Sequence, residues 1–240
     1  MELKGEKVIV TGGSDGFGAG IVRALVKRGA RVWATGRDEA KLKRLAEETQ
    51  AVAVVADVTS GADWDHLFSL VGDDVGVLVN NAGAGVRIAP LAGQSDAEIA
   101  AAVNTNLTGA IMGCARAAAR MSRRAHGAIV NISSVCALHA WPGWSVYTAA
   151  KAGLSKFSHA LHTEMRPFGV RVFCLTPSWG ATGFNRAAGI EGASEDPALA
   201  AKCISPDELG ELTAALLETP DHLAIPDFTL QPMIQDIQPM

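Results

Sequence analysis

Short apolar runs alternate with helical patterns from the first residues of the chain. Residues 7–10 form an apolar run, 18–28 have helical periodicity, 31–35 form a second run and 39–48 have the pattern of a charged surface helix. Strands of a parallel sheet are near-continuous apolar runs, because the helices that connect them bury both faces. The alternation therefore predicts an α/β fold that opens with a βαβ unit.

The rest of the chain continues this alternation. Capping boxes begin at Ser95 and Ser205, and a proline follows Ser205 at the first helical position. The C-terminal end is rich in proline, so it can supply a short strand near residues 227–231 but no helix. With the two runs above, further apolar runs at residues 51–56, 75–79, 128–132 and 171–175 give about six buried strands.

Length and composition fit one domain of this class. The chain has 240 residues, of which 48% are hydrophobic and 19% are charged. This mixture excludes disorder and can form a substantial core. We therefore expect a single domain over residues 1–240, with a doubly wound parallel sheet and helices on both faces. Residues 180–204 are rich in glycine and alanine without clear periodicity, and we expect them to form a flexible substrate flap.

Charge and cysteine usage exclude several classes of partner. The 21 basic and 25 acidic side chains give a net charge of -4, so no basic field attracts nucleic acid or anionic lipid. The four cysteines are widely separated, with no C-x-x-C pair, and are expected to be reduced and structural. The sequence also lacks a leader pattern and a run of about 18 apolar residues. We expect a cytoplasmic protein with no membrane partner.

A glycine-rich turn, residues 11–18 (TGGSDGFG), follows the first strand and opens the first helix. In this context glycines let the backbone approach a pyrophosphate, which the helix N-terminus attracts. Taken alone, such a turn is also compatible with a simple tight connection between strand and helix. We predict that it binds the phosphates of a nucleotide.

The end of the second strand bears on the choice of nucleotide. An acidic residue at this place would bind the ribose hydroxyls of NAD, but the chain has Gly36 followed by Arg37. A guanidinium can bind a 2′-phosphate through a forked pair of hydrogen bonds. Asp15 and Asp38 oppose this by placing negative charge near the same phosphate, and Arg37 could instead only solvate a surface helix. We expect NADP(H), with NAD(H) as the alternative.

Tyr147 and Lys151 form the strongest catalytic candidate. Tyr147 is the only tyrosine, and on a helix a lysine four positions later shares its face. An ammonium beside a phenol favours phenolate and lowers the phenol's pKa from about 10 toward working pH, where it can transfer a proton. An isolated pair of this kind is more often structural. The context is supplied by residues 131–134 (NISS) and 80–83 (NNAG), which end strands and face one crevice of an open parallel sheet.

Over nearly its whole length the chain resembles the short-chain dehydrogenase/reductase family. The resemblance implies a Rossmann-type fold and an enzyme that moves a hydride between NADP(H) and an alcohol or carbonyl carbon. Residues 223–232 resemble the branch that acts on small hydroxy acids and broad carbonyl substrates. The motifs that carry the resemblance, in chain order, are the glycine turn, Asp57, residues 80–83, Asn106, Ser134, Tyr147 and Lys151.

The resemblance also implies a role for each catalytic residue. Tyr147 would be the general acid for carbonyl reduction and the base for the reverse reaction, and Lys151 would bind the nicotinamide ribose and lower the tyrosine pKa. Asn106, expected in mid-helix, would hold a water of the proton relay. Ser134 would bind the substrate oxygen; it is preferred to Ser133 because it lies thirteen positions before Tyr147, so that Ser133 points to the other side of the strand.

The expected pocket departs from the family pattern in one place. The segment 176–180 (TPSWG) stands where the family commonly has Asn-Pro-Gly, which suggests that backbone groups hold the cofactor carboxamide. Substrate contacts are expected from Ser134, Trp141, Trp144, Tyr147 and Trp179. Cofactor contacts are expected from Gly12, Ser14, Asp15, Gly16, Phe17, Gly18, Arg37, Asp57, Val58, Asn81, Ala82, Gly83, Tyr147, Lys151, Pro177, Gly180 and Thr182.

Several alternatives remain open. The same fold could serve an NAD-linked alcohol dehydrogenase or a non-catalytic nucleotide-sensing protein. The Ser-His-Asp hydrolase alternative, which needs a serine nucleophile on a sharp elbow, is disfavoured. His159 and His162 are too few ligands for a metal site, so no metal is expected. The resemblance further implies a homo-oligomer, a tetramer or else a dimer, that pairs the helices bearing Asn106 and Tyr147.

Overall fold

The computed structural model describes residues 1–83, 87–184, 188 and 196–235. Its strands form one seven-stranded sheet in the order β3-β2-β1-β4-β5-β6-β7, in which every neighbouring pair is parallel. The strands are β1 Lys7–Thr11, β2 Arg31–Gly36, β3 Val52–Val55, β4 Val77–Asn80, β5 Gly127–Ile132, β6 Val170–Pro177 and β7 Asp227–Leu230.

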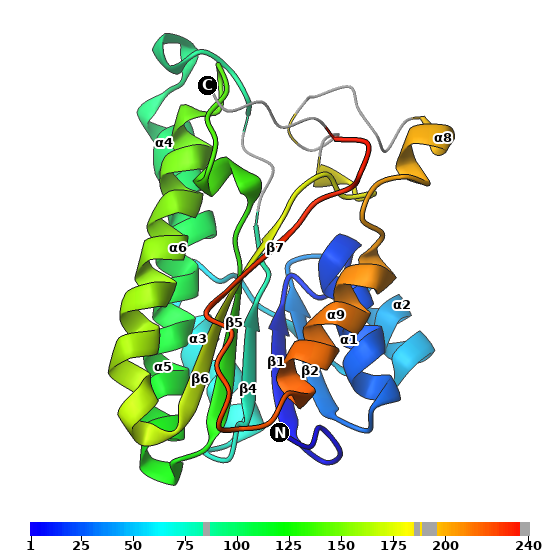
Figure 1. The fold of residues 1–240 in the computed structure, drawn as a ribbon, viewed down its shortest axis with the longest axis vertical. Coiled ribbons are helices and arrows are strands. Elements are labelled where there is room, and N and C mark those ends of the chain that lie inside the picture. The colour runs from blue at the N-terminus through cyan, green and yellow to red at the C-terminus, as the bar shows by residue number, and fades with distance from the viewer. Residues whose placement is uncertain (84–86, 185–187, 189–195, 236–240) are drawn as a thin grey trace.

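Helices cover both faces of the sheet. In Figure 1, α1, α2 and α9 lie on one side, and α3, α4, α5 and α6 lie on the other. The α-helices are α1 Gly16–Lys27, α2 Glu39–Thr49, α3 Gly61–Val71, α4 Asp96–Val103, α5 Gly109–Arg124, α6 Ser145–Met165, α8 Pro197–Ala200 and α9 Pro206–Glu218.

Each central strand contributes to two cores, one on each face. In β1, Val8 and Val10 pack in the core beneath α1 and α9, and Ile9 packs in the core beneath α3 and α5. All three side chains are fully buried. This double burial explains why the strands are continuous apolar runs, and it confirms the predicted doubly wound α/β fold.

The predicted elements agree with the structure except near the functional residues. Both capping boxes are present, at Ser95 and Ser205. Asn106 lies mid-helix as expected, but not in regular α-helical geometry. It lies in a π-helical turn, η2 Asn104–Thr108, which joins α4 to α5. Inserted π-helical turns occur frequently at functional sites, where they re-aim a side chain.

Part of the expected flap lies outside the described residues, namely 185–187 and 189–195. The described ends of residues 180–204 are joined, because Gly180 and Ile204 form a parallel bridge. The segment also contains the short helix α8. In the part of the chain that the structure describes, no helix is long and apolar enough to cross a membrane.

Candidate active site and cofactor cleft

A cleft of about 1160 Å³ opens at the carboxyl ends of the strands. The strand order reverses between β1 and β4, and in open parallel sheets the crevice at such a reversal is where ligands bind. Every site residue expected from the sequence lines this cleft except Gly18 and Asn106.

The glycine-rich turn forms one end of the cleft. Gly12 has a φ of +60°, and a Cβ there would lie 2.8 Å from Ala82 Cα. Asn81 Nδ2 donates hydrogen bonds to Thr11 O at 3.0 Å and to Gly12 O at 3.1 Å, so the segment after β4 supports the turn. Gly18 lies behind the turn, where a Cβ would collide with Gly12 O. Its lack of a side chain allows α1 to begin close to the turn, and Gly18 itself does not touch the cleft.

The corner after β2 carries more positive charge than the sequence suggested. Arg37 is exposed and forms no hydrogen bond or ion pair with the other described residues. Lys41, which was not singled out, also lines the cleft and pairs with Asp15, Nζ to Oδ2 at 2.5 Å. This hydrogen bond from Lys41 lowers the pKa of Asp15. Asp38 caps α2 by accepting from Lys41 N at 3.0 Å. Both acidic residues therefore already have local partners.

Tyr147 and Lys151 lie side by side on α6, and both are buried. Lys151 Nζ lies 5.8 Å from the centre of the Tyr147 ring and donates a hydrogen bond to Ile132 O at 2.9 Å. Burial lowers the pKa of Lys151 to about 8. Burial also raises the pKa of Tyr147, against a smaller opposing effect of its hydrogen bond with Ser134. The expected lowering of the tyrosine pKa is therefore wrong for this structure, because loss of hydration outweighs the hydrogen bond with Ser134.

The two serines after β5 point in different directions. Ser134 lines the cleft, and its Oγ accepts a hydrogen bond from Cys136 N at 3.2 Å. Ser133 Oγ instead donates to Lys151 O at 3.2 Å and lies 2.7 Å from Ser155 Oγ, both on α6. Ser134, which was preferred because it lies thirteen positions before Tyr147, thus faces the cleft, and Ser133 points to the other side as expected.

Asn106 lies behind the cleft wall rather than in it. Its side chain is 1% exposed, and its Nδ2 donates to Ala102 O at 3.0 Å. A Cβ placed on Gly83 would lie 3.0 Å from Asn106 Oδ1 and 3.7 Å from Lys151 Nζ. Because Gly83 has no side chain, Asn106 and Lys151 can both approach it closely.

Aromatic rings surround Tyr147. The ring centres of Trp144 and Phe184 lie 5.8 Å and 5.3 Å from the centre of the Tyr147 ring. Trp144 and Phe184 are themselves stacked at 6.5 Å. Trp141 and Trp179 line the same cleft. Phe184 was missed because it lies in a segment without periodicity, and no sequence pattern indicated that it would reach α6.

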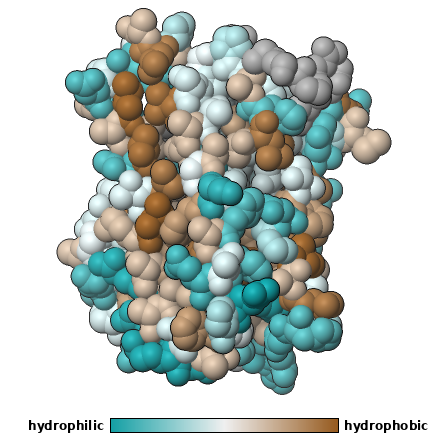
Figure 2. All heavy atoms as spheres, turned by 60° about the vertical axis from the view of Figure 1, so that its left-hand side comes forward, coloured by the Kyte–Doolittle hydropathy of each residue, from teal (hydrophilic) through white to brown (hydrophobic). Residues whose placement is uncertain are grey.

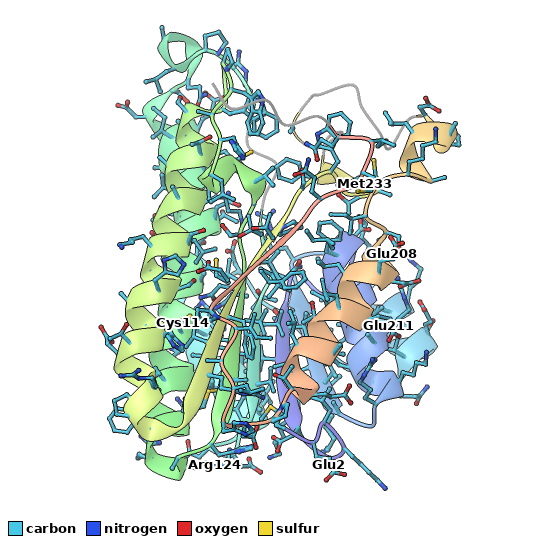
Figure 3. All side chains as sticks on the ribbon, viewed as in Figure 1. Glu2, Cys114, Arg124, Glu208, Glu211 and Met233 are labelled. Carbon is cyan, nitrogen blue, oxygen red and sulfur yellow. The ribbon has the colours of Figure 1, made fainter. Side chains whose placement is uncertain are left out.

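The C-terminal segment supplies another missed residue. Gln235 lines the cleft and is 7% exposed. Its Oε1 accepts hydrogen bonds from Ser178 Oγ and, at 3.4 Å, from Trp179 N. Figure 3 shows Met233, just before it, near the carboxyl end of the sheet. Only the path of the chain after β7 brings Gln235 here, so no local pattern announces it.

Histidines take no part in the cleft. His159 Nε2 lies 2.7 Å from Asp227 Oδ1, which links α6 to β7. Within the described ranges, no group of three or more His, Cys, Asp or Glu side chains could hold a metal ion.

Comparison with known proteins agrees with this arrangement. The family described as short chain dehydrogenase matches residues 6–191. The chain is 34% identical to 3beta-hydroxysteroid dehydrogenase 1 of Eggerthella lenta, over 90% of this chain and 92% of the relative. It is 31% identical to serine 3-dehydrogenase of Agrobacterium fabrum, over 95% and 94% of the two chains. It is 29% identical to the NADP-dependent 3-hydroxy acid dehydrogenase of Escherichia coli (strain K12), over 95% of each chain.

Solved structures are similar over the same length. The closed form of serine dehydrogenase complexed with NADP+ has a TM-score of 0.88 and 27% identity, covering 98% of each chain. A metagenomic short-chain oxidoreductase in complex with NADP has a TM-score of 0.82 and 29% identity, covering 98% of this chain and all of the other. The chain belongs to the short-chain dehydrogenase family and is an oxidoreductase that acts on CH–OH groups with NAD(P).

Proposed function

We propose that the protein is an NADP(H)-dependent oxidoreductase that interconverts a ketone or aldehyde and an alcohol by hydride transfer. The observation that carries this proposal is one cleft in which a glycine-rich turn lies at one end and Ser134, Tyr147 and Lys151 at the other. A non-catalytic nucleotide sensor would need the turn but would have no use for the three polar side chains. The arrangement therefore favours a catalyst.

The residues of the cleft fit a dinucleotide. The turn around Gly12 has no room for a side chain, and the volume suits a ligand of that size. When bound, the cofactor supplies or accepts the hydride, and the protein binds, orients and protonates. The turn and Asn81 would hold the phosphates, Asp57 and Val58 would border the base, and Pro177, Gly180 and Thr182 would border the nicotinamide.

Tyr147 is proposed as the proton donor for carbonyl reduction. Burial raises its pKa, so the phenol is protonated at neutral pH and available as a general acid. In the reverse direction the same oxygen accepts the alcohol proton. Lys151, whose pKa burial lowers to about 8, lies beside the ring and would bind the nicotinamide ribose. A protonated Lys151 would favour proton release from Tyr147.

Ser134 is proposed to bind the substrate oxygen. Its Oγ accepts from Cys136 N, which helps to hold the side chain in place at the cleft. Ser134 and Tyr147 are hydrogen-bonded to each other, and a carbonyl oxygen between the two hydroxyls would accept from both. Asn106 is proposed to act behind Lys151, through a water of the proton relay.

The charges at the corner after β2 support NADP rather than NAD. Arg37 is exposed, Gly36 removes the carboxylate that would repel a 2′-phosphate, and Lys41 neutralises Asp15. Three of the similar proteins carry NADP in their names or titles: a serine dehydrogenase complexed with NADP+, a metagenomic short-chain oxidoreductase in complex with NADP and an NADP-dependent 3-hydroxy acid dehydrogenase. An NAD-linked alcohol dehydrogenase is the alternative.

The substrate is proposed to carry an apolar group next to its carbonyl. Trp144 and Phe184 form a stacked aromatic wall against Tyr147, and such rings bind apolar surface. The branch that acts on small hydroxy acids, suggested by the relatives' names, is the competing class. We further infer that the described residues 180–184 and 196–204 belong to a flap at the outer wall of this pocket, within a single domain.

We also infer a homo-oligomer, as a tetramer or a dimer. Figure 2 shows hydrophobic residues gathered in a vertical band on the face that lies on the left in Figure 1, where α4, α5 and α6 are found. Light scattering coupled to size-exclusion chromatography distinguishes these states from a monomer.

A cytoplasmic location is supported by four free, buried cysteines, which suit a reducing compartment.

A substrate panel tests the proposal. Ketones, aldehydes and their alcohols, each paired with NADPH or NADP+ and with NADH or NAD+, are followed by the absorbance of the reduced nicotinamide. The proposal predicts turnover with NADP(H) and preference for apolar carbonyls over small hydroxy acids. Cofactor binding with no turnover across the panel would favour a nucleotide sensor.

A further inference from the structure

The end of β5 holds Lys151 at two points. Lys151 Nζ donates a hydrogen bond to Ile132 O at 2.9 Å, and Ser133 Oγ donates to Lys151 O at 3.2 Å. One contact fixes the tip of the side chain, and the other fixes its backbone. Ser133 is 3% exposed, so water does not compete for its hydroxyl.

The hydrogen bonds around Ser133 run in one direction. Since a carbonyl oxygen can only accept, Ser133 gives its single proton to Lys151 O. Ser155 Oγ, 2.7 Å from Ser133 Oγ, must therefore donate to Ser133. Cys174 Sγ in turn donates to Ser155 Oγ at 3.5 Å. The chain from β6 through α6 to β5 ends on the Lys151 carbonyl, and hydrogen bonds in such a chain polarise one another.

A neighbouring network provides the contrast. Asn131 Nδ2 donates to Ser158 Oγ at 2.8 Å, and Ser158 Oγ donates to Leu154 O at 2.7 Å. Ser158 is as deeply buried as Ser133 and also joins β5 to α6. This second network ends at Leu154 and does not touch Lys151; a hydrogen bond between Ser158 and Cys174 joins it only to the end of the first network that is farthest from Lys151 O. It stabilises the same packing without contacting the cleft.

We propose that Ser133 is a positioning residue, which holds Lys151 against the end of β5 so that its ammonium stays beside Tyr147. The proposal rests on the proposed function, in which Lys151 binds the ribose and favours proton transfer by Tyr147. Ser133 itself does not touch the reacting atoms. Its effect passes through Lys151 alone.

Replacing Ser133 by Ala removes the backbone contact and leaves Lys151 O without this donor. Loss of one neutral hydrogen bond corresponds to about a 2- to 10-fold fall in kcat. Ser133→Thr retains a hydroxyl and is expected to restore most of the activity. Ser158→Ala removes a buried serine hydroxyl of the same helix–strand packing, and kcat is expected to remain as in the wild type. Both Ala variants should lower Tm.

A second readout needs neither cofactor nor turnover. The Lys151 Nζ signal, identified by its loss in Lys151→Arg, is titrated by NMR in the protein alone. The titratable groups that face Lys151 are Tyr147, Cys136 and Cys174, and every serine variant keeps them. Burial holds the Lys151 pKa at about 8. Ser133→Ala loses the hydrogen bond to Lys151 O, which should admit water to Lys151 and raise its pKa toward the ordinary 10.5. Ser158→Ala should titrate as the wild type does.

The outcomes separate this proposal from the proposed function. A lower kcat and a raised Lys151 pKa in Ser133→Ala alone support the positioning role. Equal behaviour of Ser133→Ala and Ser158→Ala in both measurements would show that Ser133 is merely structural. If Tyr147→Phe also keeps full turnover, the proposed function itself fails; if it does not, only the role of Ser133 is rejected.

Discussion

Lys41 Nζ lies 2.5 Å from Asp15 Oδ2 at the rim of the cleft, so an ion pair joins the start of α2 to the N-cap of α1. The carboxylate that would otherwise repel a 2′-phosphate is thereby neutralised, and Arg37 next to it remains available. The corner after β2 is cationic because of this ion pair, which could not be inferred from Lys41 or Asp15 taken singly. Three of the predictions below test this corner and the buried lysine.

Arg37→Ala is expected to weaken use of NADPH far more than use of NADH. Hydrogen bonds to a charged group are worth about 1.5 to 3 kcal/mol, so a forked contact favours NADPH by about 10- to 150-fold. The measurement is kcat/KM for each cofactor with one substrate. Arg44→Ala, at an exposed arginine of the following helix α2 that does not line the cleft, is the control. Equal losses with both cofactors, or a wild type that prefers NADH, would promote the NAD-linked alternative.

Lys41→Ala should also reduce kcat/KM for NADPH several-fold, because it leaves the Asp15 carboxylate unpaired beside the phosphate. Asp15→Asn removes this charge, and asparagine is an equally good helix N-cap. The double variant is therefore expected to recover part of the loss. A double-mutant cycle on kcat/KM measures the coupling, and additive effects of the two changes would reject the pairing account.

Gly20→Ala is expected to destabilise the fold where α1 crosses α9. A Cβ at Gly20 would collide with Pro206 O, and Gly210 faces the same crossing. Overpacking of this kind costs about 1 to 3 kcal/mol, which a urea midpoint detects at unchanged slope. Gly93→Ala, where a Cβ meets nothing within 4 Å, serves as control. An unchanged midpoint in Gly20→Ala would mean that the two helices separate at no cost.

The buried Lys151 should make stability depend on pH. Its pKa is lowered to about 8 from 10.5, so between these values the unfolded chain binds more protons and stability rises with pH. Buried thiols such as Cys114, whose pKa burial raises from 9.0 to about 12, act in the opposite direction at higher pH. Because both proteins contain the same thiols, the difference in free energy of unfolding between the wild type and Lys151→Met removes the contribution of thiols such as Cys114.

Lys151→Met is accordingly expected to be more stable than the wild type at neutral pH, with an advantage that shrinks as pH rises above 8. Urea unfolding at a series of pH values gives the difference directly. A difference that stays constant across the series would show that Lys151 is not held in a desolvated site.

The sheet could be predicted from the sequence because strands such as β1 and β5 are buried on both faces, and this burial makes them apolar runs. Motif order likewise brings Ser134, Tyr147 and Lys151 to one cleft. The motif does not indicate how deeply its residues are buried. The spacing of Tyr147 and Lys151 shows that the two are neighbours, but not that desolvation raises the tyrosine pKa. The π-helical turn at Asn106 could not be predicted either, since the low helix propensity of its asparagines and threonines does not distinguish a π-turn from an α-helix.

Residues brought in by tertiary path were missed for a different reason. In the sequence, Lys41 is an ordinary lysine of a charged surface helix. Only the fold, in which this helix follows β2, places it beside Asp15. Phe184 and Gln235 come from segments without periodicity, and only the folded chain brings them to Tyr147 and Ser178. The residues that belong to a motif could be predicted, whereas Lys41, Phe184 and Gln235, which belong to none, could not.

The most direct test of the account is the kcat of Tyr147→Phe for reduction of the best carbonyl substrate with NADPH. The variant keeps the ring that packs against Trp144 and Phe184 and removes only the proton donor. The account predicts a fall of about 10² to 10⁴ in kcat, with the Kd for NADPH little changed. Turnover close to that of the wild type would contradict it.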